Sequence, residues 1–473
     1  MQLPAPFITL LSSIILAVSS VDARPLKAPR DSGMLTLPMR RIQRDNHIHV
    51  ELRHQQHINR AERLVARAAG LPGPSDAVLR ANLERRASFL TPEAKRGKRF
   101  NIPSPELLPR PGLEGTVSNV ASQNDVKPNS SGSTSKQSSL AKQSSQIDID
   151  GADTTYVADV LIGTPPRSFA IILDSGSGDF WVQSDDCTSE DGGGCGNHTF
   201  LGSDSSSSFV NTKTPWDITY GSGAASGDIV TDTVVFAGMQ LKNYTFGIAN
   251  SISESFSGDT VADGLMGLGK ASLSNQNTPT PVQALADAGL INTAITSYRL
   301  PRLVDDTNNG EVTFGGLDDS KFDSSTLVTI KTAPNTGFWI IDLGGVSVNG
   351  VDVPIAGNNS LMDTGTTLLV VPADDAAAIH AQIPGAKLTN GHYTVPCDTT
   401  ASVALTFGGK AFTIDPKDLV FAGNGRTSGD CTSGIGAFSD ANNNQWLVGD
   451  SFLKSVYFST NADDDTVTLA KAI

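Results

Sequence analysis

The sequence predicts a mostly β protein built from two related lobes, and three observations support this prediction. Short β-rich runs, such as residues 229–236, 312–314 and 466–469, are separated by clusters of Gly, Asn, Asp and Ser. Beyond residue 156, only residues 281–288 and 374–382 have a helical pattern. A short motif centred on an Asp occurs twice. A duplicated β unit predicts two lobes with one motif each, facing each other across a cleft.

Composition sets the first limits on function. The chain has 473 residues, of which 38% are hydrophobic and 18% charged, which is enough for two ordinary domains. A formal net charge of −14 argues against a nucleic-acid partner, because phosphate recognition depends on Lys and Arg. Four Cys are too few for a disulfide scaffold but fit two stabilising bridges in an exported protein.

The amino-terminal segment, residues 1–23, predicts a signal peptide. Residues 8–18 are mostly apolar and small residues follow up to Ala23, although no Lys or Arg precedes the apolar run. A run of about eleven residues is too short to span a bilayer, which needs about 20. We therefore expect an exported protein with no membrane partner; an uncleaved anchor is the alternative.

The charge distribution predicts a pro-segment at residues 24–99. This stretch holds 17 Lys and Arg against 7 Asp and Glu, whereas residues 146–473 hold 14 against 38. The two parts attract each other, and the basic stretch ends in a dibasic processing signal at residues 95–99. A solvated basic tail is the alternative. Residues 100–145 are rich in Ser and Pro and are expected to be a linker or residual pro-segment.

The predicted pro-segment carries four of the seven His of the chain, at His47, His49, His54 and His57. Their spacing is compatible with a metal site, but a basic helical face explains it better. Because His gains charge on mild acidification, these residues could also help to loosen the pro-segment at acid pH.

The predicted amino-terminal lobe, residues 146–328, begins with a β pattern. Residues 156–162 form one strand, residues 163–166 a turn, and residues 169–173 a buried strand that ends at Asp174. The carboxyl-terminal lobe, residues 329–473, has the same kind of strand before Asp363.

The repeat is the most informative feature of the sequence. Residues 171–177 read Ile-Ile-Leu-Asp-Ser-Gly-Ser, and residues 361–367 read Leu-Met-Asp-Thr-Gly-Thr-Thr. A second pair of similar runs follows at residues 264–268 and 446–450. The duplication is expected to place Asp174 and Asp363 together in the cleft.

Two adjacent carboxylates cannot both ionise easily, so they share a proton and titrate as a pair. The ionised carboxylate can take a proton from a water molecule that attacks a peptide carbonyl, while the protonated one stabilises the oxyanion. Ser177 and Thr366 are placed to hydrogen-bond the outer carboxylate oxygens. Gly176 and Gly365 permit the tight turns that bring the two loops together.

The paired motifs resemble those of pepsin-like aspartic endopeptidases, most closely the secreted fungal members, from about residue 148 to the last residue. The resemblance implies the bilobal pepsin-like fold, the shared proton, acid-pH hydrolysis of proteins and peptides, and no cofactor or metal. It implies a monomer whose pro-segment is an intramolecular inhibitor. It also implies a flap at Tyr220 and Gly221, with Trp181 hydrogen-bonded to that Tyr. The implied disulfides are Cys187–Cys195 and Cys397–Cys431.

Some residues depart from the family pattern. Ser175 replaces the commoner Thr after the first Asp, Asp179 adds an acid near the pair, and Arg167 stands where Gln is common. None of these changes removes a catalytic group. The main alternative is a catalytically inactive pepsin-like binding or inhibitor protein, which the two intact motifs disfavour. A serine hydrolase lacks its Gly-x-Ser-x-Gly motif here, and glycosidases rarely place paired carboxylates in such turns.

Export is also compatible with the glycosylation sequons. Four Asn-x-Ser/Thr sequons occur, at Asn129, Asn197, Asn243 and Asn358. The expected destination is extracellular, with a vacuolar or lysosome-like compartment as the alternative.

Overall fold

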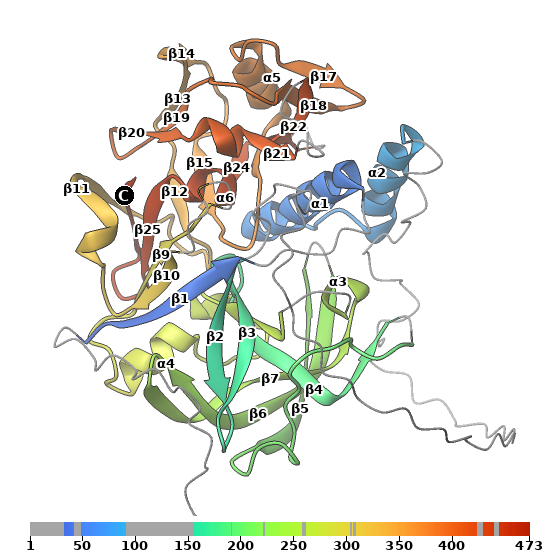
Figure 1. Cartoon of the computed structure of the whole chain (residues 1–473), viewed down its shortest axis with the longest axis vertical. Helices are drawn as coiled ribbons and strands as arrows, with labels where there is room; N and C mark the ends of the chain where they lie inside the picture. The colour runs from blue at the N-terminus through green and yellow to red at the C-terminus, as the bar shows by residue number, and fades with distance from the viewer. Residues whose placement is uncertain are drawn as a thin grey trace, which may run out of the picture.

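The computed structural model describes residues 33–41, 49–90, 156–190, 192–220, 223–257, 262–302, 305, 309–422, 429–438 and 444–473. The predicted signal peptide, the stretch 100–145 and the sequon at Asn129 lie outside these residues. The described chain is mostly β, as predicted, and has two lobes (Figure 1).

The amino-terminal lobe consists mainly of long antiparallel strands that belong to a 13-stranded sheet. The buried, alternating patterns of these strands are those that the sequence predicts for half-buried β structure. One short helix predicted from the sequence, α4 (Pro281–Asp287), follows the strands. The strands are β2 (Tyr156–Ile162), β3 (Arg167–Asp174), β4 (Phe180–Ser189), β5 (Val210–Thr219), β6 (Ala224–Phe236), β7 (Met239–Ile252) and β8 (Gly264–Gly267), with α3 (Glu254–Ser257) between the last two.

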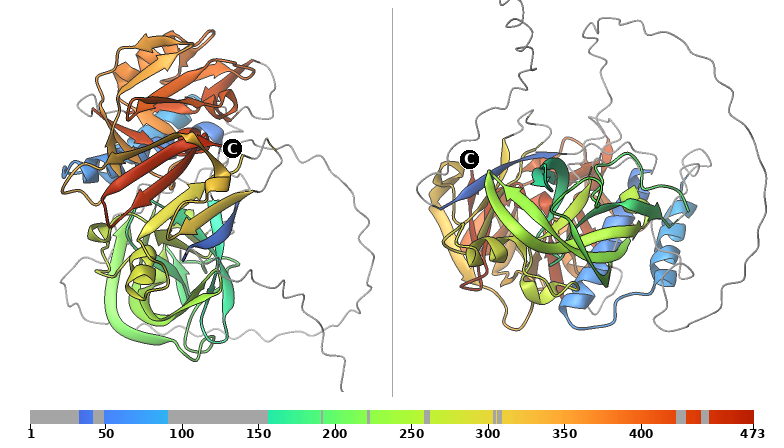
Figure 2. Two further views of the ribbon diagram at one scale, coloured as in Figure 1. Left: turned by 90° about the vertical axis from the view of Figure 1, so that its left-hand side faces the viewer. Right: turned by 90° about the horizontal axis from the view of Figure 1, so that it is seen from below.

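The same sheet continues between the lobes. Its order from one edge is β11-β26-β25-β9-β10-β1-β2, so strands from both ends of the chain meet there. Figure 2 shows this layer between the two lobes. The boundary predicted between residues 328 and 329 falls inside β11. These strands are β1 (Leu35–Arg41), β9 (Ile295–Arg299), β10 (Gly310–Phe314), β11 (Phe322–Lys331), β25 (Val456–Asn461) and β26 (Thr466–Ala472).

The carboxyl-terminal lobe contains three smaller sheets, ordered β12-β15-β24-β16-β23, β14-β13-β19-β20 and β17-β18-β22-β21. The second predicted helix is α5 (Ala373–Ala381), and a short helix, α6 (Asp450–Leu453), follows β24. The strands are β12 (Ile340–Asp342), β13 (Gly345–Val348), β14 (Val351–Val353), β15 (Asn359–Met362), β16 (Leu369–Val371), β17 (Lys387–Thr389), β18 (His392–Pro396), β19 (Val403–Phe407), β20 (Lys410–Ile414), β21 (Val420–Ala422), β22 (Asp430–Ser433), β23 (Ile435–Ala437) and β24 (Gln445–Val448).

The basic amino-terminal segment is folded onto both lobes. Its strand β1 pairs with β10 on one side and β2 on the other. Helix α1 (Val50–Ala68) then passes between the lobes, and α2 (Asp76–Ser88) packs beside it (Figure 1). The segment therefore lies over the acidic body, as the charge distribution predicts.

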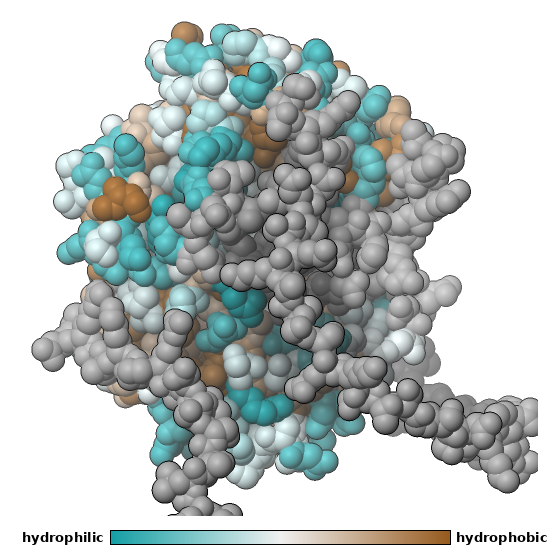
Figure 3. All heavy atoms as spheres, in the orientation of Figure 1, coloured by the Kyte–Doolittle hydropathy of each residue, from teal (hydrophilic) through white to brown (hydrophobic). Residues whose placement is uncertain are grey.

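Apolar side chains fill the interior of both lobes. One hydrophobic cluster joins strands of the amino-terminal lobe, the interlobe sheet and the carboxyl-terminal lobe. On the face seen in Figure 3 the coloured surface is mainly hydrophilic, with small separate apolar patches. Among the described residues, no helix is both long enough and apolar enough to cross a membrane. Disulfides join Cys187 to Cys195 and Cys397 to Cys431, the pairing that the resemblance implies.

Candidate active site

Equivalent strands of the two lobes present Asp174 and Asp363. Asp174 is the last residue of β3, and Asp363 directly follows β15. β3 pairs in parallel with β8, and β15 pairs in parallel with β24. The second pair of repeated sequence runs therefore lies beside the first in both lobes, and both copies of the repeat belong to one site.

The two motif loops are joined by reciprocal hydrogen bonds. The amide of Ser175 donates to Thr364 Oγ1 at 3.0 Å, and the amide of Thr364 donates to Ser175 Oγ at 2.9 Å. Each hydroxyl also donates to the opposite loop, from Ser175 to the Met362 carbonyl at 3.2 Å and from Thr364 to the Leu173 carbonyl at 2.9 Å. Ser175 therefore forms the contacts that match those of Thr364, and its departure from the family pattern costs no hydrogen bond.

Each carboxylate is held by its own turn. The Gly176 amide donates to Asp174 Oδ1 at 3.0 Å, and Ser177 donates to Asp174 Oδ2 at 2.8 Å. The Gly365 amide donates to Asp363 Oδ1 at 2.8 Å, and the Thr366 hydroxyl donates to Asp363 Oδ2. Both Asp side chains are fully buried. All four supporting residues predicted from the sequence therefore contact the carboxylates.

The glycines allow the two carboxylates to approach each other. A Cβ atom at Gly176 would lie 2.5 Å from Asp363 Oδ1, and one at Gly365 would overlap Asp174 Oδ1. Each glycine thus faces the carboxylate of the opposite lobe. Any larger residue would push the two loops apart.

The surroundings separate the pKa values of the two carboxyl groups. Burial and the neighbouring charge of Asp174 raise the pKa of Asp363 to about 7. Burial also acts to raise the pKa of Asp174, but the charge of Arg60 and hydrogen bonds from Asp363 and Ser177 outweigh it, so this pKa is lowered. With Arg60 docked, the proton that the pair shares therefore lies on Asp363 rather than on Asp174.

Trp181 and Tyr220, the residues predicted at the flap, lie close to the Asp174–Asp363 pair. Trp181 Nε1 donates to the Tyr220 hydroxyl at 2.9 Å, as the resemblance implies. Both side chains are buried in a cluster that also contains Trp216 and Phe256. Gly221 lies outside the described residues.

Arg60 is the residue at the site that sequence analysis did not identify. It extends from α1 of the basic amino-terminal segment, and its Nη2 lies 3.2 Å from Asp174 Oδ2 and 3.9 Å from Asp363 Oδ2. One and two turns further along the same face, Arg63 donates to the Tyr220 carbonyl at 3.0 Å and Arg67 to the Leu273 carbonyl at 3.0 Å. The helical spacing of these Arg residues could have predicted that they share one face of a helix. The sequence did not indicate which of them reaches the carboxylates.

Other predicted residues form their side-chain hydrogen bonds with groups outside the carboxylate pair. Asp179 is buried and accepts hydrogen bonds from the Ser274 hydroxyl at 2.8 Å and the Gln276 amide at 3.0 Å, so it stabilises a neighbouring turn. Arg167 donates to the Phe200 carbonyl at 2.6 Å. The described sequon residues are exposed; they are Asn197, Asn243 and Asn358.

Comparison with known proteins is consistent with this geometry. Residues 155–472 match the eukaryotic aspartyl protease family. The chain is 36% identical to a probable aspartic-type endopeptidase CTSD of Arthroderma benhamiae, over 68% of this chain and 62% of the relative. It is 33% identical to the major aspartyl peptidase 1 of Cryptococcus neoformans, over 68% of this chain and 70% of the relative. It is 32% identical to a probable vacuolar protease A of A. benhamiae, over 67% of this chain and 78% of the relative.

The matched region thus spans about three fifths of the length of the first of these relatives. It contains both Asp motifs, both lobes and both disulfides, and it begins just after the Ser- and Pro-rich stretch. On this evidence the chain belongs to the eukaryotic aspartyl protease family.

Proposed function

We propose that this chain is the zymogen of an aspartic endopeptidase that hydrolyses peptide bonds in proteins at acid pH. The observation that carries the proposal is the arrangement of Asp174 and Asp363. They are two fully buried carboxyl groups presented by equivalent loops of two lobes, with opposite pKa shifts. A paired acid and base of this kind can activate water without a metal ion or a covalent intermediate.

In the proposed reaction, ionised Asp174 takes a proton from a water molecule as the water oxygen attacks the scissile carbonyl carbon. Protonated Asp363 gives its proton to the carbonyl oxygen, which yields a neutral tetrahedral diol. Asp174 then transfers its proton to the amide nitrogen while Asp363 takes back a proton from a hydroxyl group. The C–N bond breaks and releases a carboxylic acid and an amine.

The hairpin at Tyr220 and Gly221 is the proposed flap. It would close over a bound peptide and exclude bulk water from the carboxylate pair. The hydrogen bond from Trp181 fixes the Tyr220 hydroxyl. The carbonyl of Tyr220 accepts a hydrogen bond from Arg63 of the pro-segment. We propose protein and peptide substrates on this basis.

The pro-segment is the proposed intramolecular inhibitor. Arg60 occupies the position that a substrate carbonyl and the attacking water would need, and it neutralises the charge of Asp174. Arg63 and Arg67 attach the same helix to the amino-terminal lobe. Until α1 leaves, a substrate therefore cannot enter the site, and Asp174 cannot activate the attacking water.

A buried His pair supports release of the pro-segment at acid pH. Arg86 of α2 has Nη1 2.5 Å from Nδ1 of His392, which can accept this bond only when neutral. His54 of α1 is 1% exposed, and among the described residues neither ring nitrogen makes a hydrogen bond of normal geometry; only the Ser433 backbone is close enough to raise its pKa. The groups that face His54 are His57, Arg86 and His392, all cationic when protonated. Of the other predicted His, His49 caps α1 and His47 lies outside the described residues.

The sign of the pH effect follows from these contacts. Burial and the charge of Arg86 lower the pKa of His54 well below its ordinary value and that of His392 to about 4. The docked state thus resists protonation, whereas both His would protonate near pH 6.5 after release. Docking should be fully favourable above about pH 6.5 and weaken progressively as pH falls toward 4.

Location and assembly are proposed from the remaining features. Residues 1–23 support export, and the three described sequon residues are exposed. We favour an extracellular monomer; one relative is named a vacuolar protease, and a vacuolar destination uses the same route.

The test is hydrolysis of an unfolded protein after the purified full chain is shifted from neutral to acid pH. Asp363→Asn should abolish hydrolysis, whereas Asp287→Asn, a matched change at an exposed Asp of α4, should leave it intact. No hydrolysis by folded, processed wild-type protein would reject the proposal and favour an inactive binding or inhibitor protein.

A further inference from the structure

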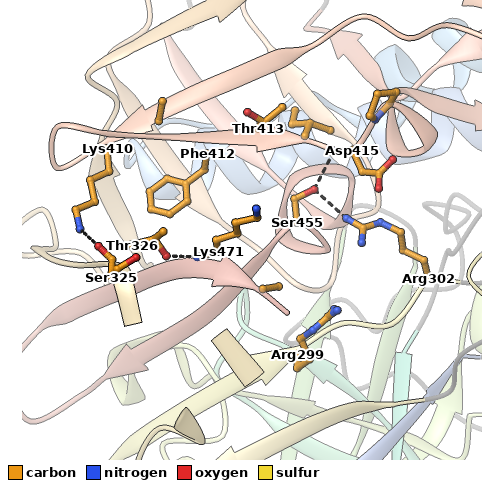
Figure 4. A pocket seen from close by; sticks show the side chains of 14 residues that line it. Arg299, Arg302, Ser325, Thr326, Lys410, Phe412, Thr413, Asp415, Ser455 and Lys471 are labelled. Carbon is orange, nitrogen blue, oxygen red and sulfur yellow. Dashed lines mark hydrogen bonds between the residues drawn. The ribbon is translucent and has the colours of Figure 1, made fainter. Parts of the chain in front are cut away.

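A large cavity between the interlobe sheet and the carboxyl-terminal lobe has no role in the proposed reaction. Its volume is about 680 Å³, and it lies between the interlobe strands β9, β11 and β26 on one side and β20 with the segment after it on the other (Figure 4). None of the motif residues lines it. The cavity is therefore separate from the Asp174–Asp363 site.

The side chains around this cavity are unusually basic for this protein. Residues 146–473 contain only 14 Lys and Arg. Four of them, Arg299, Arg302, Lys410 and Lys471, line this one cavity, together with a single acid, Asp415. Residues 146–473 carry a large excess of Asp and Glu, so the lining of this cavity has the opposite charge to the rest of this part of the chain.

Most of these cations lack an Asp or Glu partner. Within the described part of the chain, no Asp or Glu side chain lies within 4.0 Å of Arg299, Lys410 or Lys471. Arg299 donates to the Leu300 carbonyl and, at 3.3 Å, to the carboxylate of the last residue, Ile473, whereas Lys410 donates to the backbone oxygens of Ser325 and Leu327. Asp323 feels the charge of both lysines, but hydrogen bonds from Ser325 are the main cause of its lowered pKa.

Arg302 differs because it has a partner. Its Nε donates to Asp418 at 2.6 Å, and the same carboxylate also binds Lys454 at 2.6 Å. Arg302 also lies 3.9 Å from Asp305, which binds Lys417, so two acids serve three cations.

Burial lowers the pKa of Arg299, and repulsion from Arg302 adds to this effect. The charges of Asp305 and Glu311 act in the opposite direction on Arg299. Lys410 and Lys471 remain without an Asp or Glu side chain within 4.0 Å among the described residues, so basic side chains outnumber acidic ones around the cavity.

Two of these cationic side chains converge on Ser455. Arg302 Nη2 donates to the Ser455 hydroxyl at 2.9 Å, and the Asp415 amide donates to the same oxygen at 3.1 Å. Figure 4 shows Lys471 and Arg302 directed toward Ser455 from opposite sides, with Arg299 below them. Lys410 turns toward Ser325 at the other end of the cavity, beyond Phe412 (Figure 4).

We propose that this cavity binds a small molecule bearing a phosphate or sulfate group, with the oxyanion between Arg299, Lys471 and Ser455. Guanidinium and ammonium groups are the preferred partners of tetrahedral oxyanions. Phosphate and sulfate keep a negative charge at acid pH, where carboxylate ligands would be neutral. The cavity extends past this head group along Phe412 and Thr326, which leaves room for an uncharged organic body.

The test is the thermal unfolding of the full-length chain with Asp363→Asn in the background, so that no hydrolysis interferes. Sodium phosphate, sodium sulfate, glycerol 3-phosphate and glucose 6-phosphate are titrated at constant ionic strength against chloride, because chloride controls for general screening. A saturable rise in Tm with phosphate or sulfate is expected. A phosphate ester that binds more tightly than the free ion identifies an organic ligand, whereas equal affinity identifies the free ion.

Matched substitutions locate the binding. Lys471→Gln and Arg299→Gln should each weaken binding by about tenfold, the effect of losing one charged contact. Lys410→Gln should weaken it much less, because this side chain lies at the far end. Lys331→Gln is the control, since Lys331 is another exposed Lys whose ammonium donates only to a carbonyl. Absence of a saturable shift, or equal loss of affinity with Lys331→Gln and Lys471→Gln, would overturn the proposal. Neither result depends on peptidase activity.

Discussion

Ser175 and Thr364 exchange hydrogen bonds across the two lobes: each amide donates to the hydroxyl of the other residue, at 3.0 and 2.9 Å. Since each hydroxyl also donates to a carbonyl of the opposite loop, four bonds fix the two motifs relative to each other. The separation of Asp174 and Asp363 depends on this connection. The fold thus sets the proton affinity of the pair through residues that would not contact substrate.

Loss of this connection should affect both stability and activity. We expect Thr364→Val to lower the free energy of unfolding by about 2–4 kcal/mol, because two buried amide or carbonyl groups lose their partner. Activity of the processed protein should fall with it. Ser175→Thr keeps the hydroxyl and is the control, with near wild-type values expected. Chemical denaturation and hydrolysis assays measure both, and an equal loss with the two substitutions would contradict the account.

Arg60→Gln should weaken the inhibition of the zymogen. It removes the cation that neutralises Asp174, so the pKa of Asp174 should rise and α1 should bind less tightly. We expect processing to begin at a higher pH than in the wild type. Arg85→Gln on α2 is the matched control, because the Arg85 guanidinium donates to Asn82 of its own helix and, among the described residues, not to either lobe. The pH midpoint of processing, followed by electrophoresis, is the measurement; an unchanged midpoint in Arg60→Gln would count against the inhibitory contact.

His54→Phe should delay release of the pro-segment on acidification. The Phe ring can pack on Phe421, which contacts His54 edge to face at 5.4 Å, and it removes a group that must lose its proton to remain docked. The expected result is a processing midpoint shifted to lower pH by about one unit or less.

His57→Phe provides the control for this prediction. It makes the same chemical change on the same helix, and His57 also contacts Phe421, at 5.7 Å. Because the charge of His57 acts on His54, a smaller shift in the same direction is expected. A shift in His57→Phe as large as that in His54→Phe would contradict the leading role of His54.

The bond between Trp181 and Tyr220 should matter for turnover rather than for folding alone. Trp181→Phe and Tyr220→Phe each remove the 2.9 Å hydrogen bond while keeping an aromatic ring. We expect each to lower kcat/KM by roughly tenfold, and the double variant to be no worse than either single one, because one shared interaction is lost. Additive losses would mean that the two residues act independently of each other.

The sequence predicted the architecture because its strongest signal is a duplication. Two apolar strands that each end in Asp, a hydroxyl residue and Gly specify both lobes and the close approach of Asp174 and Asp363. The helices at residues 281–288 and 374–382 were also predicted correctly, within one or two residues. These features are local, so periodicity and turn chemistry suffice to predict them.

The remaining features depend on contacts between distant parts of the chain. The positive charge of the basic amino-terminal segment predicts that it lies on the acidic body. Net charge does not determine which residue meets which partner, so the sequence does not distinguish the roles of Arg60, Arg63 and Arg67. Strand β1 was not predicted because its pairing partners, β10 and β2, lie far along the chain. Asp179 adds an acid near the carboxylate pair, but its hydrogen-bond partners are backbone amides and a hydroxyl about 95 residues along the chain, which no local pattern reveals.

The most direct test of the account is the pH dependence of kcat/KM for the processed protein between about pH 2 and 8, measured beside Asp174→Asn and Asp363→Asn. The account predicts hydrolysis that requires one proton shared by the pair, with activity lost toward neutral pH and abolished by either substitution. Hydrolysis that persists in a folded Asp363→Asn protein would contradict the claim that the two carboxyl groups act as one catalytic pair.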